Sequence, residues 1–248
     1  MKTKKRQKIR YFILLISFLL FPITINYFSP YLSVVGPSEG IVNGSLFTFI
    51  ALLFFSLFFG RFFCGWICPA GALQEAQSAA FPKQFKNNWK NHIKYVIWVF
   101  WFGLIISFLI SAAGMLRINF FFMTEKYISV SEPMNYIIYY GVIIIIMFFP
   151  LFFGKRASCH LICWMAPFMV IGHKVSSLLS FPRLRLMTQK SSCIDCMKCE
   201  KECLMSLPVN SYIETGEISS SECIKCFKCV DICPTGSIFL VLKGKKNI

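Results

Sequence analysis

The sequence has 248 residues, of which 56% are hydrophobic, 17% aromatic and 15% charged. Soluble domains are about 45–50% apolar and about 25% charged, so these values argue against an ordinary cytosolic enzyme. The large apolar fraction also excludes a disordered chain. Lys and Arg outnumber Asp and Glu by 26 to 11, which gives a net charge of +15, and twelve residues are cysteines. We therefore expect a membrane protein with one small soluble module.

Four stretches without a charged residue are each long enough for a helix to cross about 30 Å of hydrocarbon. They predict transmembrane helices near residues 11–28, 43–61, 95–114 and 135–153. A cleaved signal peptide is the alternative at the N-terminus, but this apolar stretch is too long and no small-residue cleavage site follows it. We therefore expect an all-α membrane bundle of four helices that begins with an uncleaved span.

The basic residues predict the orientation of these helices. Residues 1–10 contain six Lys or Arg, the first loop none, the second five, the third two and the chain from Lys155 onward thirteen. By the positive-inside rule, both chain ends then lie in the cytoplasm and the protein lies in the cytoplasmic membrane. The excess of positive charge is a topology signal, so we expect membrane lipid rather than nucleic acid as a partner.

Eight cysteines near the C-terminus form two runs of the pattern Cys-x2-Cys-x2-Cys-x3-Cys, offset by 30 residues. This pattern is typical of bacterial ferredoxins with two [4Fe-4S] clusters, in which the fourth cysteine of each run ligates the other cluster. Structural zinc usually takes separated Cys pairs, and disulfides need an oxidising compartment. We assign cluster I to Cys193, Cys196, Cys199 and Cys233, and cluster II to Cys223, Cys226, Cys229 and Cys203. We therefore expect this segment to fold as a small α+β ferredoxin domain, with a short hairpin at residues 211–218.

The other four cysteines are Cys64, Cys68, Cys159 and Cys163, in two Cys-x3-Cys elements 95 residues apart. Each element follows a predicted span, a Phe-Phe-Gly sequence and a basic residue, which indicates a duplicated helical hairpin in the membrane part. On a helix, the two thiols of each pair would share a face. The four thiols could ligate a metal or an additional cluster, act as redox-active thiols, or pack between helices as small apolar groups.

With these motifs the chain resembles the NapH-type membrane polyferredoxins, the quinol-dehydrogenase family of periplasmic nitrate reductase, and the C-terminal half of the nitrous oxide reductase regulator NosR. The resemblance covers residues 10–240 and all twelve cysteines. Cys64-x3-Cys68-Pro69 fits the pattern of these families in full, whereas Trp164 follows Cys163 where they have proline. The resemblance implies several spans, two cytoplasmic [4Fe-4S] clusters and electron exchange with quinol.

The chain divides into a basic N-terminus (1–10), a first hairpin with its Cys-x3-Cys element (11–94), a second hairpin with its element (95–181), a linker (182–192), the ferredoxin domain (193–240) and a basic tail (241–248). The second hairpin ends with a surface-lying or re-entrant helix at residues 164–181. No pair of histidines is placed for a haem, and His160 is expected to be solvated at the interface. Motifs for flavin attachment or nucleotide binding are absent from the sequence.

Three functions fit these observations. The first is an electron-transfer subunit, of the quinol-dehydrogenase type, that exchanges electrons between the quinone pool or a redox partner protein and the clusters. The second is a metal-handling or assembly factor, for example for copper reduction or oxidase assembly, whose membrane thiols are supplied with electrons by the ferredoxin. The third is an iron–sulfur redox sensor. The sequence leaves open whether the chain is itself an enzyme.

Overall fold

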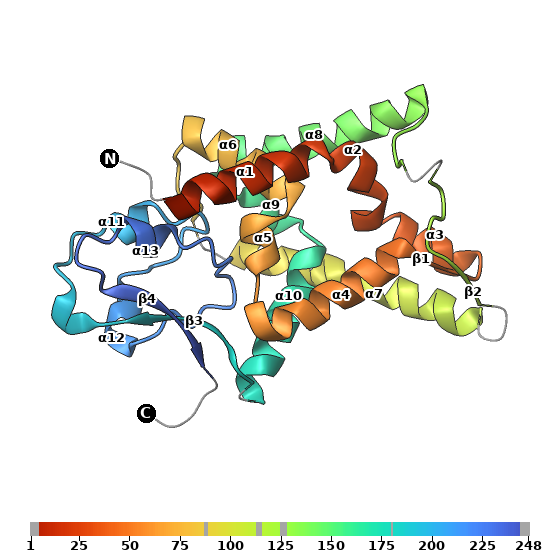
Figure 1. Cartoon of the computed structure of the whole chain (residues 1–248). Helices are drawn as coiled ribbons and strands as arrows, with labels where there is room; N and C mark the ends of the chain where they lie inside the picture. Colours follow the sequence, from red (N-terminus) through yellow and green to blue (C-terminus); the bar gives the residue numbers. More distant parts are fainter. Residues whose placement is uncertain (1–4, 87–88, 113–115, 125–127, 180, 244–248) are drawn as a thin grey trace.

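The structure, a computed structural model, describes residues 5–86, 89–112, 116–124, 128–179 and 181–243. Residues 1–4 of the basic N-terminus, 244–248 of the basic tail and 125–127 of the third loop lie outside the described residues. The described chain is mostly helical, with two sheets of two strands each. Long helices form one part of the molecule, and the cysteine-rich segment 181–243, called the ferredoxin domain below, forms the other (Figure 1).

Among the described residues, two straight helical segments are long and apolar enough to cross a membrane. One is α7 (Ile93–Ser111) together with η2 (Trp89–His92), which precedes it, and the other is α8 (Pro133–Phe153). Both present large apolar side chains on their outer surfaces, such as Phe100 at 73% exposed and Ile137 at 67%. An apolar surface of this kind identifies a membrane protein.

A third candidate span is bent. Helix α1 (Lys5–Leu19) is followed by α2 (Phe21–Thr24) and η1 (Ile25–Phe28), with an angle of 58° between the two parts. Pro22 lies in the first turn of α2, where proline has no N–H to continue the hydrogen bonds of α1. Helix α4 (Gly44–Phe59) is apolar but has only 16 residues, about 24 Å at 1.5 Å per residue. The structure therefore gives two to three candidate spans, and our number of four stays a prediction.

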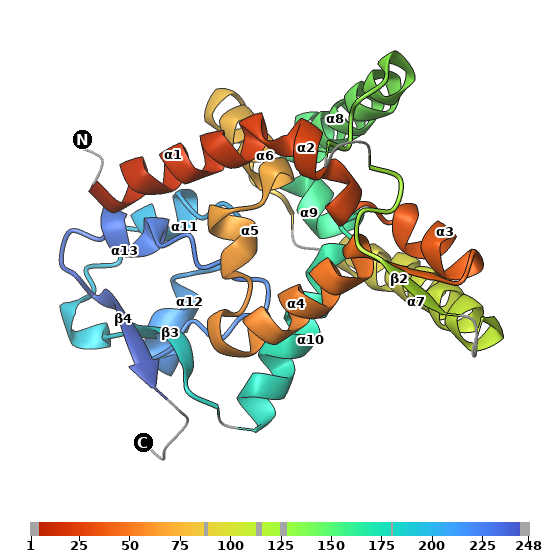
Figure 2. The same ribbon diagram turned by 45° about the vertical axis from the view of Figure 1, so that its right-hand side comes forward.

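A small parallel sheet lies on the side of the molecule away from the ferredoxin domain, near α3 and α7 (Figures 1 and 2). Strand β1 (Ile41–Asn43) follows helix α3 (Leu32–Ser38) and pairs with β2 (Arg117–Asn119). The Asn43 side chain then caps α4 by accepting a hydrogen bond from Leu46 N at 3.2 Å. This sheet joins the beginning of α4 to the segment that follows α7.

Helices α4 and α8 end in the same way, which places the Cys-x3-Cys elements. Each ends at a glycine with positive φ, Gly60 at 60° and Gly154 at 102°, a conformation that side chains disfavour. A short helix and a longer one follow in each case: α5 (Phe62–Trp66) and α6 (Pro69–Ala80), or α9 (Ala157–Leu161) and α10 (Met165–Leu178). The first cysteine of each pair lies on the short helix, and the second lies just before the longer one.

Helix α10 occupies the segment for which we expected a surface-lying or re-entrant helix, and its position relative to the membrane stays a prediction. Of its 14 residues, nine are buried, and it packs against α4. A Cβ atom on Gly172 would overlap Ser56 Oγ, so the two helices are in close contact there. The Phe168 ring stacks on Phe49 with centroids 5.4 Å apart. The small residues on both helices permit this approach.

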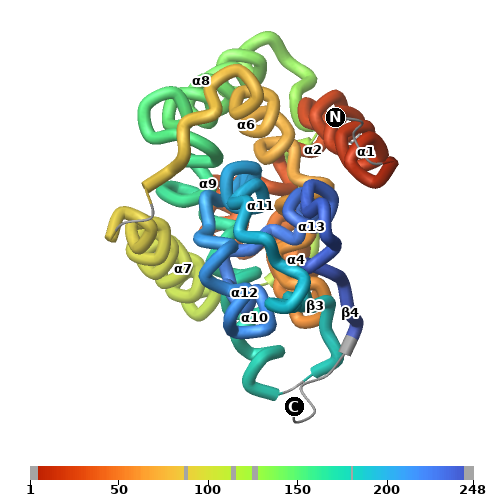
Figure 3. Tube along the Cα trace, turned by 90° about the vertical axis from the view of Figure 1, so that its left-hand side faces the viewer, coloured from red at the N-terminus to blue at the C-terminus, as the bar shows by residue number. Residues whose placement is uncertain are grey.

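The ferredoxin domain begins earlier than predicted. Strand β3 (Arg183–Thr188) pairs antiparallel with β4 (Ile238–Lys243), so most of the expected linker 182–192 belongs to the domain. The remaining elements are η3 (Lys190–Ser192), α11 (Lys198–Lys201), α12 (Ser211–Thr215) and α13 (Lys228–Ile232). Figure 3 shows this domain in front of the long helices, with α1 beside it.

The hairpin expected at residues 211–218 is wrong. The segment forms α12, which ends at Gly216 with φ 77°, and glycine in this conformation is a common helix C-terminus. An isolated bridge between Met187 and Glu217 joins the segment to β3. Two backbone hydrogen bonds flank it, from Thr188 N to Gly216 O at 2.9 Å and from Ile218 N to Leu186 O at 2.8 Å.

The backbone of the ferredoxin domain repeats with the 30-residue offset of the cysteine runs. Three residues of the first half have φ near +50°, and their equivalents in the second half share this left-handed conformation: Asp195, Met197 and Ser206 correspond to Lys225, Phe227 and Gly236. Such angles are uncommon for residues other than glycine. The repeat is therefore structural as well as sequential.

Candidate iron–sulfur and thiol sites

The structure brings the four cysteines assigned to cluster I to one small pocket. Cys193, Cys196, Cys199 and Cys233 all line it, although Cys233 is 34 residues beyond Cys199 in the sequence. Burial opposes ionisation of Cys233, but hydrogen bonds from Thr235 and Ser237 lower the pKa of this thiol. Because iron binds the thiolate, this environment suits a ligand.

The four cysteines assigned to cluster II are also neighbours. Burial, together with the nearby Cys226 and Cys223, raises the pKa of Cys203 to about 12. Burial likewise raises the pKa of Cys229 well above its usual value, and the neighbouring Cys226, Cys223 and Cys203 act in the same direction. The backbone N–H of Leu207 points at Cys203 Sγ at 3.4 Å. Cys203 thus lies with the second run, as cross-ligation requires, and the ligand assignment itself stays a prediction.

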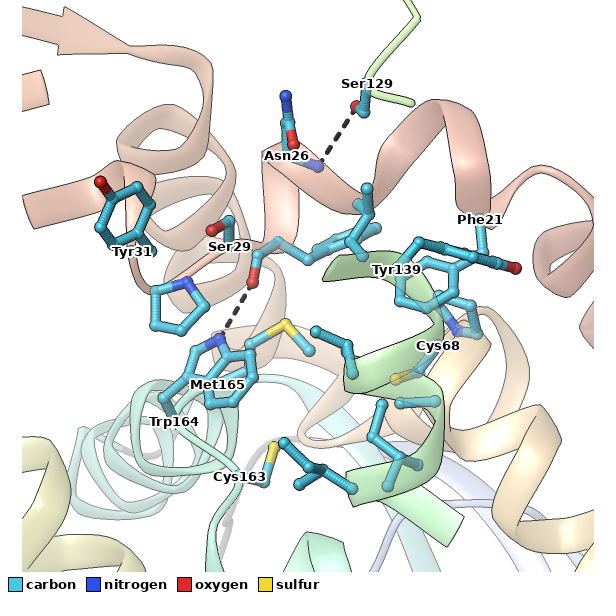
Figure 4. Close-up of a pocket in the computed structure, with 18 of the residues that line it drawn as sticks. Phe21, Asn26, Ser29, Tyr31, Cys68, Ser129, Tyr139, Cys163, Trp164 and Met165 are labelled. Carbon is cyan, nitrogen blue, oxygen red and sulfur yellow. Dashed lines mark hydrogen bonds between the residues drawn. The ribbon is translucent and has the colours of Figure 1, made fainter. Parts of the chain in front are cut away.

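The four remaining cysteines meet as well, but not in the way that we expected. Cys64 lies in α5 and Cys68 just before α6, so the pair spans a break between helices instead of one helical face. Cys159 in α9 and Cys163 before α10 repeat this arrangement. All four line one cavity of about 640 Å³. Figure 4 shows Cys68 and Cys163 on its wall, together with Trp164, Met165 and Tyr139.

Polar and soft groups contact these thiols. Gln74 Nε2 donates to Cys159 Sγ at 3.3 Å, and the Cys64 thiol lies 3.9 Å from Met169 Sδ. Burial, together with neighbouring Cys159 and Cys64, raises the pKa of the Cys163 thiol to about 12. Such thiols stay protonated until a metal ion displaces the proton.

Two buried carboxylates organise the cations around the thiols. Glu75 accepts hydrogen bonds from Arg10 (Nη1, 2.8 Å) and Arg156 (Nη2, 3.1 Å), and it lies 3.4 Å from Lys228 Nζ. Burial alone would raise the pKa of Glu75, but these cations bring it to about 2. Glu75 belongs to no motif that would have identified it in the sequence, although only 11 acidic residues occur in the whole chain.

The second carboxylate, Glu222, likewise belongs to no motif. It accepts a hydrogen bond from Arg61, two from Lys94 Nζ at 2.8 and 2.7 Å, and one from Tyr95 Oη at 3.0 Å. Burial opposes its ionisation, yet Arg61 and Lys94 bring the pKa of Glu222 to about 2. Together, Glu75 and Glu222 neutralise only two of four fully buried cations, Arg10, Arg61, Lys94 and Arg156.

His160 is not solvated, contrary to our expectation. It is 0% exposed, stacks on Phe85 with centroids 4.3 Å apart, and places Nδ1 3.0 Å from Asn91 Oδ1. Burial, with Lys94 nearby, lowers the pKa of His160 to about 3. The ring is therefore a neutral packing group beside the thiols.

The chemistry of these sites rests on the cysteines. Across the described ranges, no group of three His, Cys, Asp or Glu side chains is arranged to hold a single metal ion. A [4Fe-4S] cube differs from a single ion because each of its cysteine ligands binds a separate iron corner. Four convergent cysteines with buried cations beside them suit an anionic iron–sulfur centre.

Comparison with family models gives two matches. Residues 44–88, which contain Cys64 and Cys68, match a 4Fe-4S binding domain, and residues 192–238 match a 4Fe-4S dicluster domain. The second match contains all eight cysteines of the two runs. Both matches agree with the polyferredoxin resemblance.

Several known proteins are similar over most of this chain. An uncharacterised protein of Methanocaldococcus jannaschii is 25% identical over 84% of this chain and 77% of its own length. The putative electron transport protein YccM of Escherichia coli is 26% identical over 84% of this chain, which spans 58% of YccM. The regulatory protein NosR of Pseudomonas aeruginosa is 27% identical over 77% of this chain, which spans 26% of NosR. No solved structure matches the chain.

Proposed function

We propose that this chain is an iron–sulfur electron-transfer protein of the cytoplasmic membrane that exchanges electrons between the quinone pool, or a membrane partner, and two cytoplasmic [4Fe-4S] clusters. The observation that carries this proposal is the position of the four thiols. They line a cavity whose α5 wall contacts the ferredoxin domain, where Trp66 Nε1 donates to Lys225 O at 2.9 Å. The name of the similar protein YccM, a putative electron transport protein, supports a redox role.

The same cavity suits a quinone head group. Its volume of about 640 Å³ falls within the roughly 300–1,000 Å³ of small-molecule sites. Its walls are mostly apolar and include Phe21, Tyr139 and Ile146 from candidate spans. Gln74, Asn26 and Ser158 are among the few polar residues of its lining. Apolar walls with a few polar groups bind a quinone ring and fix its orientation.

The four thiols of the cavity act as one redox site in this proposal. Four buried cations share two carboxylates, so the surroundings carry surplus positive charge. Thiolates around an iron–sulfur cluster carry net negative charge, which offsets this surplus, whereas two disulfides would be neutral. The charge balance therefore favours an additional metal centre over a thiol–disulfide relay.

Anaerobic iron analysis and quinol titration test the proposal. We expect more than about eight irons per chain, the number for two cubanes, and reduction of the clusters by a quinol analogue. Cys64→Ser should remove the excess iron and leave the ferredoxin iron in place. A protein without iron after anaerobic reconstitution would refute the iron–sulfur assignment, and clusters that no quinol reduces would refute quinone exchange.

A metal-handling role is the second candidate, because of one contact. The Met169 thioether lies 3.9 Å from the Cys64 thiol, and thiols with thioethers are the ligands that Cu(I) prefers. Copper bound at one equivalent per chain, and lost in Met169→Leu, would favour this candidate.

A further inference from the structure

The two ferredoxin runs have the same backbone but opposite environments. Ile194 of the first run is 63% exposed, whereas its equivalent Ile224 is 2% exposed. Met197 is 43% exposed, whereas its equivalent Phe227 is 4% exposed. Cys196 is exposed too. Because the two runs share one backbone conformation, the repeat cannot explain the difference in exposure. The difference arises from the segments that cover the second run.

Helix α5, which carries Cys64, covers the second run. A Cβ atom on Gly65 would overlap the Ile224 carbonyl oxygen and lie 3.4 Å from Cys226 N. The Trp66 indole donates to Lys225 O at 2.9 Å, and its ring lies 5.8 Å from that of Phe227. The residue that follows Cys64 therefore touches the loop that holds Cys223 and Cys226 through backbone atoms.

Helix α1 stabilises this contact between α5 and the second run by hydrogen bonds to both. Arg10 donates from Nη1 to Gly65 O at 2.9 Å and from Nε to Gln7 Oε1 at 2.9 Å. Gln7 Nε2 in turn donates to Cys226 O at 3.0 Å. Arg10 and Gln7 thus connect α5 to the cluster II loop in a buried chain of hydrogen bonds. Arg6 holds the outer end by donating to both carboxylate oxygens of Asp231 at 2.6 and 3.1 Å.

We propose that the two clusters have a fixed order: cluster II is the inner centre, which exchanges electrons with the thiol site across the contact between Gly65 and Ile224, and cluster I is the outer centre. This inference rests on the proposed function. One electron crosses at a time, so the thiol-site centre loses the electron that cluster II gains, and no bond forms or breaks. The exposed residues Ile194, Cys196 and Met197 then leave cluster I on the outer side of the ferredoxin domain.

Exposure of the clusters to water tests their order. The full chain in lipid nanodiscs is reduced with dithionite, and the electron paramagnetic resonance saturation of each cluster is measured with and without a water-soluble gadolinium chelate. Cys196→Ser and Cys226→Ser assign the signals to cluster I and cluster II. We expect the chelate to relax cluster I strongly and cluster II weakly. Equal relaxation, or stronger relaxation of cluster II, would overturn the order without touching the iron–sulfur assignment.

Gly65→Ala tests the contact, with Gly103→Ala as its control because a Cβ atom on Gly103 meets nothing within 4 Å. In Gly65→Ala, we expect full iron content, loss of amide-exchange protection at Ile224–Phe227 and slower cluster reduction by a quinol analogue. Trp66→Phe, which removes one hydrogen bond and keeps the ring, should show a smaller change in the same direction. Unchanged exchange and reduction in both variants would refute the contact, whereas a lack of iron in the wild type would refute the proposed function itself.

Discussion

Replacing Glu75 by Gln removes the only carboxylate that Arg10 and Arg156 contact in the structure as described. The glutamine keeps the size of the side chain but leaves these two fully buried guanidinium groups, and the partly buried Lys228, without a negative charge. Removing one partner of a buried ion pair is strongly destabilising because the remaining charge is uncompensated. We therefore expect a large loss in the free energy of unfolding.

The pKa of Glu75 gives the size of this loss. The difference between the ordinary value of 4.5 and the value of about 2 in the folded protein corresponds to about 3 kcal/mol at 1.36 kcal/mol per pKa unit. Removal of a buried partner in other proteins costs about 3–5 kcal/mol, in agreement. For a chain of this size, a 3 kcal/mol loss lowers Tm by roughly 6–12 °C.

Thermal unfolding in one detergent at pH 7 measures this effect. The matched control is Glu214→Gln, because Glu214 pairs with Lys190 at 3.0 Å but both side chains are more than 70% exposed, and such pairs contribute at most about 1 kcal/mol. A Glu75→Gln protein as stable as the Glu214→Gln protein would refute the argument.

The same pair of proteins has a defined pH dependence. The folded pKa of Glu75 is depressed, so its stabilisation is fully present above pH 4.5 and is lost as the pH falls toward 2. The difference in Tm between the wild type and Glu75→Gln should therefore be constant from pH 7 to about 5 and shrink below pH 4.5. A difference that stays constant to pH 3 would assign the loss to packing instead of charge.

Three further predictions concern topology and cysteine ligation. A reporter fused after Ile248 should be cytoplasmic, and an exported reporter would refute both the four-span topology and the argument for reduced thiols. Cys203→Ala should damage the cluster of the second run and spare the cluster of the first, as magnetic resonance spectra would show; damage to the first-run cluster instead would contradict cross-ligation. Cys64→Ser and Cys159→Ser should each abolish electron transfer between membrane and ferredoxin, and the double variant should be no worse, because members of one unit are not additive. Single variants with normal transfer rates would leave only the packing explanation.

The sequence predicted the elements whose signal is local. The charge-free stretches located α7 and α8 within two or three residues, and the cysteine spacing located both ferredoxin runs. It did not predict the bend beyond Leu19 or the burial of α10, since both depend on what packs alongside. The strand β3 was missed although residues 183–186 alternate basic and apolar side chains as a strand does, because its partner β4 lies more than 50 residues later.

The candidate site was predictable by residue type but not by arrangement. The twelve cysteines were found, yet the Cys-x3-Cys spacing suggested one helical face where the chain breaks between two helices. Glu75 and Glu222 carry no motif, and only the fold shows that each gathers cations from distant segments. His160 was misjudged because a histidine between two cysteines gives no sign in the sequence of the Phe85 ring that covers it.

The contacts between α1 and the ferredoxin domain constrain the order in which this protein is synthesised and folds. Arg6 and Asp231 are 225 positions apart, so at about 5–20 residues per second the ribosome needs roughly 10–45 s to supply the second after the first. During that interval α1 cannot form its contacts with the ferredoxin domain. After its synthesis, the loop Ile224–Phe227 remains accessible to solvent until α1 and α5 pack against it. We therefore expect iron and sulfide to reach the second run before this closure, which makes cluster insertion a step of folding and not an event that follows it.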